Sequence, residues 1–341
     1  MTPLESLLWP LTIPYGAATR LRARAHRTGM LRARHLDGVV ISVGNLTLGG
    51  TGKTPMVLWI AERLLAEGKK LGILTRGYRG QKSATGATSD EVQLLQSRLG
   101  DRLAFGVGPN RYAHGRELVK RGVEWFILDD GFQHLRLARD VDLVLIDATN
   151  PFGNGHLLPA GRLREPKSAL ARADIIVITR ADRAPAVEAA IRRESNAPIF
   201  YARTRLDSIR SFADGQIGGE VQPAQLGKLF AFCAIGNPAA YLADLRQWAL
   251  QIAGRHFFPD HHRYTQRDDA TIEREARASG ASALICTEKD LPNLHAIQHR
   301  FPIFYCSISL IIDRDVEFWR TVLSLARSRA YRHQANLFPE T

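Results

Sequence analysis

The stretch from Val39 to Leu65 constrains the fold of this chain more than any other. It reads VVISVGNLTLGGTGKTPMVLWIAERLL, a short β-branched run, a glycine-rich turn and then apolar residues at helical spacing. Strand, Gly-Gly-Thr-Gly-Lys-Thr and helix follow one another in the order of a phosphate-binding loop. Glycines let the backbone wrap a polyphosphate with its N–H groups inward, where the following helix dipole favours negative charge. The stretch therefore predicts a nucleoside-triphosphate site.

Within this loop, two side chains have expected roles. Lys53 can reach the β- and γ-phosphates, and the hydroxyl of Thr54 can hold Mg²⁺. The strict pattern has a glycine five residues before Gly52, where this chain has Thr47. An ordinary glycine turn is the alternative, but Gly-Lys-Thr at a strand-to-helix junction favours the phosphate loop. The predicted ATP-binding residues are Thr47, Leu48, Gly49, Gly50, Thr51, Gly52, Lys53 and Thr54.

A second informative stretch, rich in acidic residues, lies at residues 124–134 and reads EWFILDDGFQH. An apolar run that ends in an acid is typical of the second magnesium-holding strand of phosphate-loop enzymes. A turn rich in helix-capping residues would explain an Asp-Gly pair but not the added Gln133 and His134. Asp129 and Asp130 are therefore the predicted metal ligands, together with Thr54.

A helix start is expected at Asp90 and Glu91, after a small, polar loop at residues 81–90. The two acids either favour the helix dipole or are carboxylates held near the phosphate site.

Charge and the first segment suggest an anionic partner. The net charge is +12 and the pI near 10.0, which fits nucleic acid, an acidic membrane surface, a phosphorylated substrate or plain solubility. Residues 4–18 are apolar and carry Trp9 and Tyr15. Pro10 and Pro14 are expected to break this run, which is too short and too interrupted to span a bilayer. Six arginines follow between residues 20 and 34. The apolar segment and the arginines that follow it have three possible interpretations. They are an interfacial membrane anchor, a solvated helix face and a nucleic-acid contact.

The order of predicted elements indicates the fold class and the domains. Strands and helices alternate, which predicts an α/β fold: a P-loop NTPase-type parallel sheet flanked by helices, with a second, smaller α/β domain joined by a β-hairpin linker. Cys233, Cys286 and Cys306 lie in apolar runs without metal spacing and are expected to be buried free thiols. The expected parts are a membrane-associating helical segment at 1–36, a kinase core at 37–203, a two-stranded linker at 204–228 and a C-terminal domain with a closing helix at 229–341.

Several sequence blocks resemble one known family. They are GNLT-x-GG-x-GKTP (44–55), TRGY-x-G (75–80), the acid pair at 90–91, DDGFQH (129–134), FGNG (152–155), LPAG-x-LRE (158–165), the GNP turn (236–238), FPDH (258–261) and TEKD (287–290). In this order they resemble the tetraacyldisaccharide 4′-kinase family of lipid A biosynthesis over nearly the whole chain. The family shares Thr47 at the loop, whereas Val92 stands where the family usually has proline after the acid pair.

The resemblance implies transfer of the γ-phosphoryl group of ATP, with Mg²⁺, to the 4′-hydroxyl of an acylated glucosamine disaccharide 1-phosphate. It implies that Asp90 is the general base, that His261 orients it, and that Lys53 contacts the phosphates. Pairing of Asp90 with His261 would bring the second domain over the loop, so domain closure is expected. The supporting residues that it implies are Glu91, Arg76, Gln133, His134, Arg164 and Glu165. A monomer on the cytoplasmic face of the inner membrane of a Gram-negative bacterium is expected.

Other functions remain as alternatives. A nucleotide-switch ATPase of the partitioning or maturation type has a further lysine before the glycines of its loop, and this chain has Thr47 and Leu48 there. A nucleic-acid-dependent NTPase is suggested only by the pI, and no aromatic ladder is interleaved with the basic residues, so no nucleic-acid partner is expected. A soluble sugar or nucleoside kinase would not need the apolar first segment.

Overall fold

The structure, a computed structural model, describes residues 3–77, 89–213, 215–294 and 300–337. Residues 78–80 of the predicted TRGY-x-G block, and most of the loop expected at 81–90, lie outside the described residues. The chain forms two compact units. Unit 1 comprises Met1–Ala87, Leu99–Arg203 and Ile311–Thr341, and unit 2 comprises Thr88–Arg98 and Thr204–Leu310.

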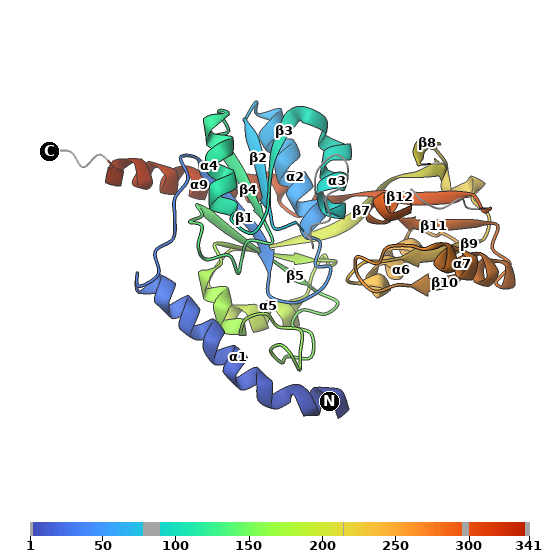
Figure 1. Ribbon diagram of the computed structural model, residues 1–341, viewed down its shortest axis with the longest axis horizontal. Coiled ribbons are helices and arrows are strands. Elements are labelled where there is room, and N and C mark those ends of the chain that lie inside the picture. Colours follow the sequence, from blue (N-terminus) through green and yellow to red (C-terminus); the bar gives the residue numbers. More distant parts are fainter. Residues whose placement is uncertain (1–2, 78–88, 214, 295–299, 338–341) are drawn as a thin grey trace. The chain divides into compact units, whose positions relative to one another are not determined.

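Unit 1 is built on a parallel sheet in the order β3-β2-β4-β1-β5-β6-β7 (Figure 1). Its strands are β1 (Val39–Asn45), β2 (Leu71–Thr75), β3 (Leu103–Val107), β4 (Trp125–Asp129), β5 (Val141–Asp147), β6 (Ile175–Thr179) and the first part of β7 (Ile199–Ala213). Strands β2, β4, β5 and β6 are buried along their whole length, as their continuous apolar runs require in a sheet that helices cover. Because β1 lies between β4 and β5, the loop after it leaves from the centre of the sheet.

Helices cover both faces of this sheet. They are α2 (Lys53–Ala66), α4 (Arg111–Lys120), α5 (Pro185–Arg192) and α9 (Asp315–Leu337), and unit 1 also contains α1 (Pro3–Arg27). Helices α2 and α9 pack together, since the Trp59 ring meets the rings of Phe318 and Trp319 edge-on at 5.3 and 5.9 Å. Helix α4 contributes its buried Leu118 to one apolar cluster of unit 1, and α5 contributes its buried Ile191 to another. The expected parallel α/β sheet flanked by helices is therefore present.

Helix α1 runs unbroken through Pro10 and Pro14, so the break expected at the two prolines is wrong. Both prolines lie on the exposed side, where water can hydrate the carbonyls that lose an N–H partner. The Thr12 hydroxyl also donates to the carbonyl of Trp9 at 2.6 Å. Within the described residues, no helix is long and apolar enough to cross a membrane.

Unit 2 has its own parallel strands in the order β10-β9-β11-β12. They are β9 (Leu229–Cys233), β10 (Ile252–Phe257), β11 (Ala283–Thr287) and β12 (Ile303–Ile312), and the later part of β7 pairs antiparallel with β8 (Gln216–Glu220). The helices are α3 (Asp90–Leu99), α6 (Pro238–Gln247), α7 (Gln266–Ala278) and the short α8 (Leu291–Leu294). The three cysteines are buried and free, as expected.

The domain boundaries expected from the sequence stay a prediction, but the division into units differs from them at two segments. Residues 88–98 belong to unit 2, although the chain enters them from the loop after β2 of unit 1. Residues 311–341 return to unit 1, where Trp319 donates to Glu67 at 2.7 Å and Arg63 pairs with Asp315 at 2.7 Å.

Candidate active site

The phosphate loop ends at Gly52, which caps the N-terminus of α2 in the left-handed conformation, with φ of 88°. A side chain in that conformation is strained, so this position needs glycine. Helix α2 then begins at Lys53, and its first N–H groups face the loop without intrahelical partners. The loop is thus built as an anion site at a helix N-terminus.

Residues 129–134, at the end of β4, form a turn that we call the acid turn. The ammonium of Lys53 lies between the end of β1 and this acid turn. Its Nζ donates to Oδ1 of Asn45 at 3.3 Å and lies 3.5 Å from Oδ1 of Asp130. Asn45 in turn donates from Nδ2 to the carbonyl of Thr47 at 2.8 Å. The lysine side chain is only 13 % exposed, so these contacts fix its direction.

The two aspartates have different surroundings. Asp129 pairs with Val43 across β4 and β1, is 4 % exposed, and accepts from the Thr75 hydroxyl at 3.2 Å. Asp130 has a left-handed backbone, φ 49°, and its carboxylate accepts from Nη1 of Arg164 at 2.6 and 2.8 Å. Burial alone would raise the pKa of Asp130, but the charges of Lys53 and Arg164 hold it below its ordinary value.

The segment of residues 158–165 runs beside the phosphate loop. The Leu48 N–H donates to the Arg162 carbonyl, and the Arg164 N–H to the Leu46 carbonyl, both at 2.8 Å. Gln133 donates from Nε2 to the Asn45 carbonyl at 2.9 Å. Unit 1 therefore brings together the predicted residues Thr47, Lys53, Asp129, Asp130, Gln133 and Arg164.

Glu165 is 1 % exposed and pairs with Arg172 at 2.9 Å, so it supports the segment rather than facing a ligand. The turn after β6 adds a further arginine beside the phosphate loop. Arg180, with φ of 62°, donates to the Gly50 carbonyl at 3.0 Å and forms an ion pair with Asp147.

Arginines surround the predicted residue His134. Burial, and then the charges of Arg111, Arg139, Arg136 and Arg22, lower the pKa of His134 to about 4. The ring is therefore neutral near pH 7. Arg111 is 7 % exposed and lies close enough to Asp129 and Asp130 for their charges to act on it. Arg111 and Asn45 are not among the predicted site residues: Arg111 lies outside the sequence blocks of the site, and Asn45 lies in the GNLT block without a role assigned from the sequence. Arg76, exposed at the end of β2, adds positive charge beside Arg111.

Unit 2 holds a second group of predicted residues. Asp90 is the first residue of α3, and its Oδ2 lies 3.2 Å from Nδ1 of His261. His261 has a left-handed backbone, φ 61°, and its N–H donates to the Ala234 carbonyl at 3.1 Å. Burial would raise the pKa of Asp90, but the hydrogen bond and charge of His261, and the charge of Lys289, hold it below its ordinary value.

Lys289 balances the remaining acids of this group. Its Nζ lies 3.7 Å from Glu91 and 3.4 Å from Asp260. Burial would lower the pKa of Lys289, but Glu91, Asp260 and Asp90 raise it above its ordinary value. Glu91 is thus held beside Asp90 by a shared cation.

The oxygen donors of unit 1 fit a magnesium ion. The described residues include no cluster of three or more histidine, cysteine or acidic side chains that could hold a metal by themselves. Phosphate-loop enzymes do not need one, because a loop hydroxyl, one acid, water and the nucleotide phosphates share the ion. The Thr54 hydroxyl at the start of α2 and the carboxylates that follow β4 supply hard oxygen donors of this kind.

Comparison with known proteins shows the family of this chain. The sequence model of the tetraacyldisaccharide-1-phosphate 4′-kinases matches residues 4–327. The tetraacyldisaccharide 4′-kinase of Geobacter metallireducens is 41 % identical over 322 residues, covering 89 % of this chain and 92 % of that protein. That of Geobacter sulfurreducens is 42 % identical over 320 residues, covering 87 % of each. The chain belongs to the tetraacyldisaccharide-1-phosphate 4′-kinase family.

A solved structure extends the agreement to the fold. The structure of LpxK from Aquifex aeolicus, determined in complex with ATP, matches with a TM-score of 0.71 and 26 % identity over 95 % of this chain and 99 % of that one. The P-loop fold and the lipid-kinase function expected from the sequence are confirmed, and the family is favoured over the nucleotide-switch ATPase.

His134 should give the stability of the protein a measurable pH dependence. Between about pH 6.5 and 4 the unfolded chain protonates this histidine while the folded chain keeps it neutral. The free energy of unfolding therefore falls as the pH is lowered through this window, by roughly 2 kcal/mol after allowance for partial solvent screening. Urea unfolding at pH 7 and pH 4.5 should show a smaller fall for His134→Gln than for the unsubstituted protein. Equal falls in both would contradict a neutral His134.

Proposed function

We propose that this chain transfers the γ-phosphoryl group of ATP to the 4′-hydroxyl of a tetraacylated glucosamine disaccharide 1-phosphate. The observation that carries the proposal is the ammonium of Lys53, directed by Asn45 and Asp130 beside a phosphate loop, in a chain of this kinase family. Relatives named for this activity align with nearly the whole chain, so both groups of candidate residues fall inside the match.

In this proposal unit 1 handles the charge of the nucleotide. The N–H groups of loop residues 47–54 and the ammonium of Lys53 bind the phosphates. Thr54 and Asp129 or Asp130 hold Mg²⁺, which neutralises charge on the β- and γ-phosphate oxygens when bound. Arg164, already paired with Asp130, keeps that carboxylate ionised and in place.

Unit 2 supplies the base. As the 4′-oxygen forms its bond to the γ-phosphorus and the bond from phosphorus to the β–γ bridging oxygen breaks, the hydroxyl proton passes to the Asp90 carboxylate and ADP leaves. The lowered pKa of Asp90 keeps it ionised near pH 7, ready to accept that proton. His261 fixes the orientation of the carboxylate through the 3.2 Å contact. The reaction thus needs residues of both units on one substrate, in keeping with the domain closure expected from the sequence.

We also propose that the enzyme binds peripherally, as a monomer, to the anionic cytoplasmic face of the inner membrane, with no nucleic-acid partner. Support comes from α1, on which large apolar side chains are exposed beside a run of arginines. The exposed apolar residues of α1 are Leu7, Trp9, Leu11, Ile13 and Leu21. The helix also contacts the candidate site: Tyr15 donates to the Arg164 carbonyl at 2.9 Å, and Arg22 to the Gln133 carbonyl at 3.3 Å.

Phosphoryl transfer can be measured directly. With labelled Mg-ATP and tetraacyldisaccharide 1-phosphate in detergent micelles, the protein should label the lipid, and Lys53→Ala should lower kcat/KM at least about 100-fold because a phosphate contact is lost. Lys120→Ala is the matched control, since that ammonium is 63 % exposed and pairs only locally with Glu117. A folded, ATP-binding protein that left the lipid unlabelled would contradict the proposal.

The acid–histidine pair has its own test. Asp90→Asn should lower kcat by about 100- to 10,000-fold with little change in ATP affinity, because it removes the proton acceptor. His261→Gln should lower kcat less. The control is Asp268→Asn, which removes the charge from another carboxylate–histidine contact of unit 2, with His262 at 3.0 Å. Normal turnover by Asp90→Asn would exclude Asp90 as the base.

Membrane binding can be separated from catalysis. Ile13→Asp should weaken co-flotation of the protein with phosphatidylethanolamine–phosphatidylglycerol vesicles, since it places a negative charge on the apolar side of α1. Val316→Asp is a matched control, because the two side chains are 60 % and 63 % exposed. Equal flotation of the two variants would contradict the role of α1.

A further inference from the structure

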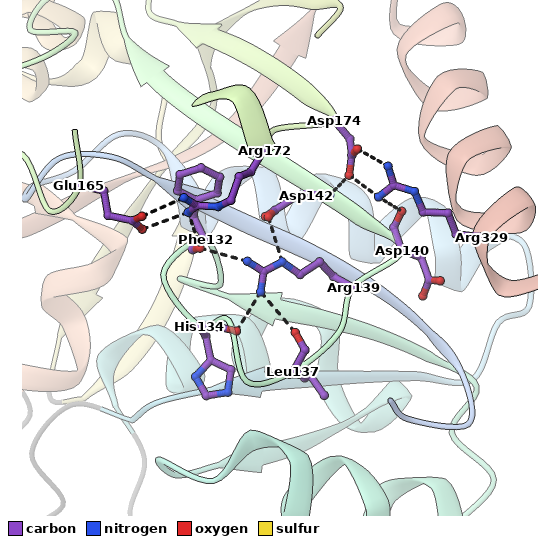
Figure 2. Close-up of polar contacts among 10 residues, drawn as sticks. All are labelled: Phe132, His134, Leu137, Arg139, Asp140, Asp142, Glu165, Arg172, Asp174 and Arg329. Carbon is purple, nitrogen blue, oxygen red and sulfur yellow. Dashed lines mark hydrogen bonds and ion pairs between the residues drawn. The ribbon is translucent and has the colours of Figure 1, made fainter. Parts of the chain in front are cut away.

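The acid turn after β4 is held by backbone bonds and by one arginine side chain. Its N–H groups find carbonyl partners, from Gly131 to Val43 at 3.1 Å and from His134 to Gly131 at 2.8 Å. The carbonyls of Phe132, His134 and Leu137 all accept from one guanidinium, that of Arg139, at 3.1, 2.8 and 3.3 Å (Figure 2).

Arg139 is itself firmly anchored. Its Nε donates to Oδ2 of Asp142 at 2.9 Å, and the two side chains are only 10 % and 6 % exposed. Asp142 lies on β5, directly beside Ser42 of β1, so the guanidinium is tied to the centre of the sheet. A planar fork with several fixed donors can serve three carbonyls and a carboxylate together, which the single ammonium of a lysine cannot do.

A second arginine acts on the same carbonyl. Nη2 of Arg172 lies 3.4 Å from the Phe132 carbonyl, and its guanidinium lies over the Phe132 ring at 4.4 Å. Arg172 also donates two hydrogen bonds to the carboxylate of Glu165, which follows Arg164 in the sequence. The two arginines therefore both donate to the Phe132 carbonyl (Figure 2).

The turn needs such support because its conformation is strained. Asp130 is not glycine, yet its φ is 49°, a conformation that persists only when the surroundings impose it. The next residues also approach β1 closely: a Cβ at Gly44 would come within 2.6 Å of the Phe132 nitrogen. A shift of the Phe132 carbonyl would therefore move the carboxylate that pairs with Lys53 and Arg164.

We propose that Arg139 is a positioning residue for phosphoryl transfer, which holds the turn through the carbonyls of Phe132 and His134 so that Asp130 faces Lys53 and the magnesium nucleotide. It acts through the turn and contacts no substrate. The inference rests on the proposed function, because it names what orients the acid of that site.

The test compares two arginines that make similar forks. Arg329 binds Asp174 with two donors at 2.8 and 2.5 Å and the Asp140 carbonyl at 3.3 Å, so its partners lie next to Arg139 and Asp142 but not on the acid turn itself (Figure 2). Arg139→Lys and Arg329→Lys each keep the charge and lose the fork. Both should lower the melting temperature, and only Arg139→Lys should change how the protein uses Mg²⁺.

Binding of a fluorescent ATP analogue is the first measurement, in EDTA and over a Mg²⁺ titration. Arg139→Lys should bind the analogue in EDTA within about twofold of the unsubstituted protein, but need about tenfold more Mg²⁺ for the metal-dependent increase in affinity. In the lipid assay, the kcat of Arg139→Lys should be lower than that of the unsubstituted protein. Its KM for ATP, measured in buffer without EDTA, should return to the unsubstituted value at high Mg²⁺. Arg329→Lys should match the unsubstituted protein in every Mg²⁺ titration.

An unchanged Mg²⁺ requirement in Arg139→Lys, or the same change in Arg329→Lys, would overturn the proposal. If Arg139→Lys does not fold, Asp142→Asn tests the same point, since it weakens the anchor of the guanidinium and should raise the Mg²⁺ requirement by a smaller factor. Failure of the proposed function is distinguishable: the unsubstituted protein would then leave the lipid unlabelled, while the nucleotide titrations would still report on Arg139.

Discussion

The register of β1 against β4 is the constraint on which the rest of unit 1 depends. Val43 lies opposite Asp129, so the phosphate loop and the acid turn leave the sheet side by side. Lys53 and Asp130 come from these two exits and meet at 3.5 Å. A register slip of one residue would turn Asp129 to the other face of the sheet and separate the acids from the loop.

Charge balance follows from that proximity. A buried acid beside a polyphosphate would be protonated or repelled if it stood alone, because both burial and like charge disfavour the ionised form. Lys53 and Arg164 lower the pKa of Asp130 despite its burial, so the carboxylate is ionised before a nucleotide binds. Burial, together with the arginines around it, lowers the pKa of His134 and keeps the ring neutral, so it can serve as a hydrogen-bonding group but adds no charge. The site is thus organised in advance of its ligand.

What the sequence could predict depends on how local each signal is. The phosphate loop and the acid turn are continuous patterns, and both were recognised. Strand β10 and helix α7 have no such pattern, because β10 contains Gly254 and Arg255 and α7 buries little besides Ile272 and Ala276. The break expected in α1 failed because proline is tolerated on an exposed helix face. The contact of Asp90 with His261 joins positions 171 residues apart, so no spacing encodes it and only family resemblance suggested it.

The path of the chain gives the acid–histidine pair a particular property. Residues 88–98 leave unit 1 after β2, contribute Asp90 to unit 2, and return to unit 1 at Leu99. Arg98, at the end of this excursion, pairs with Glu288 through two hydrogen bonds of 2.8 and 2.6 Å, which fixes α3 within unit 2. Asp90 therefore meets His261 inside one compact unit, and the pair is formed whatever the other unit does. In the proposed mechanism, proton transfer and phosphate binding are thus prepared in different units, and a substitution in either group can be assigned to one of the two tasks.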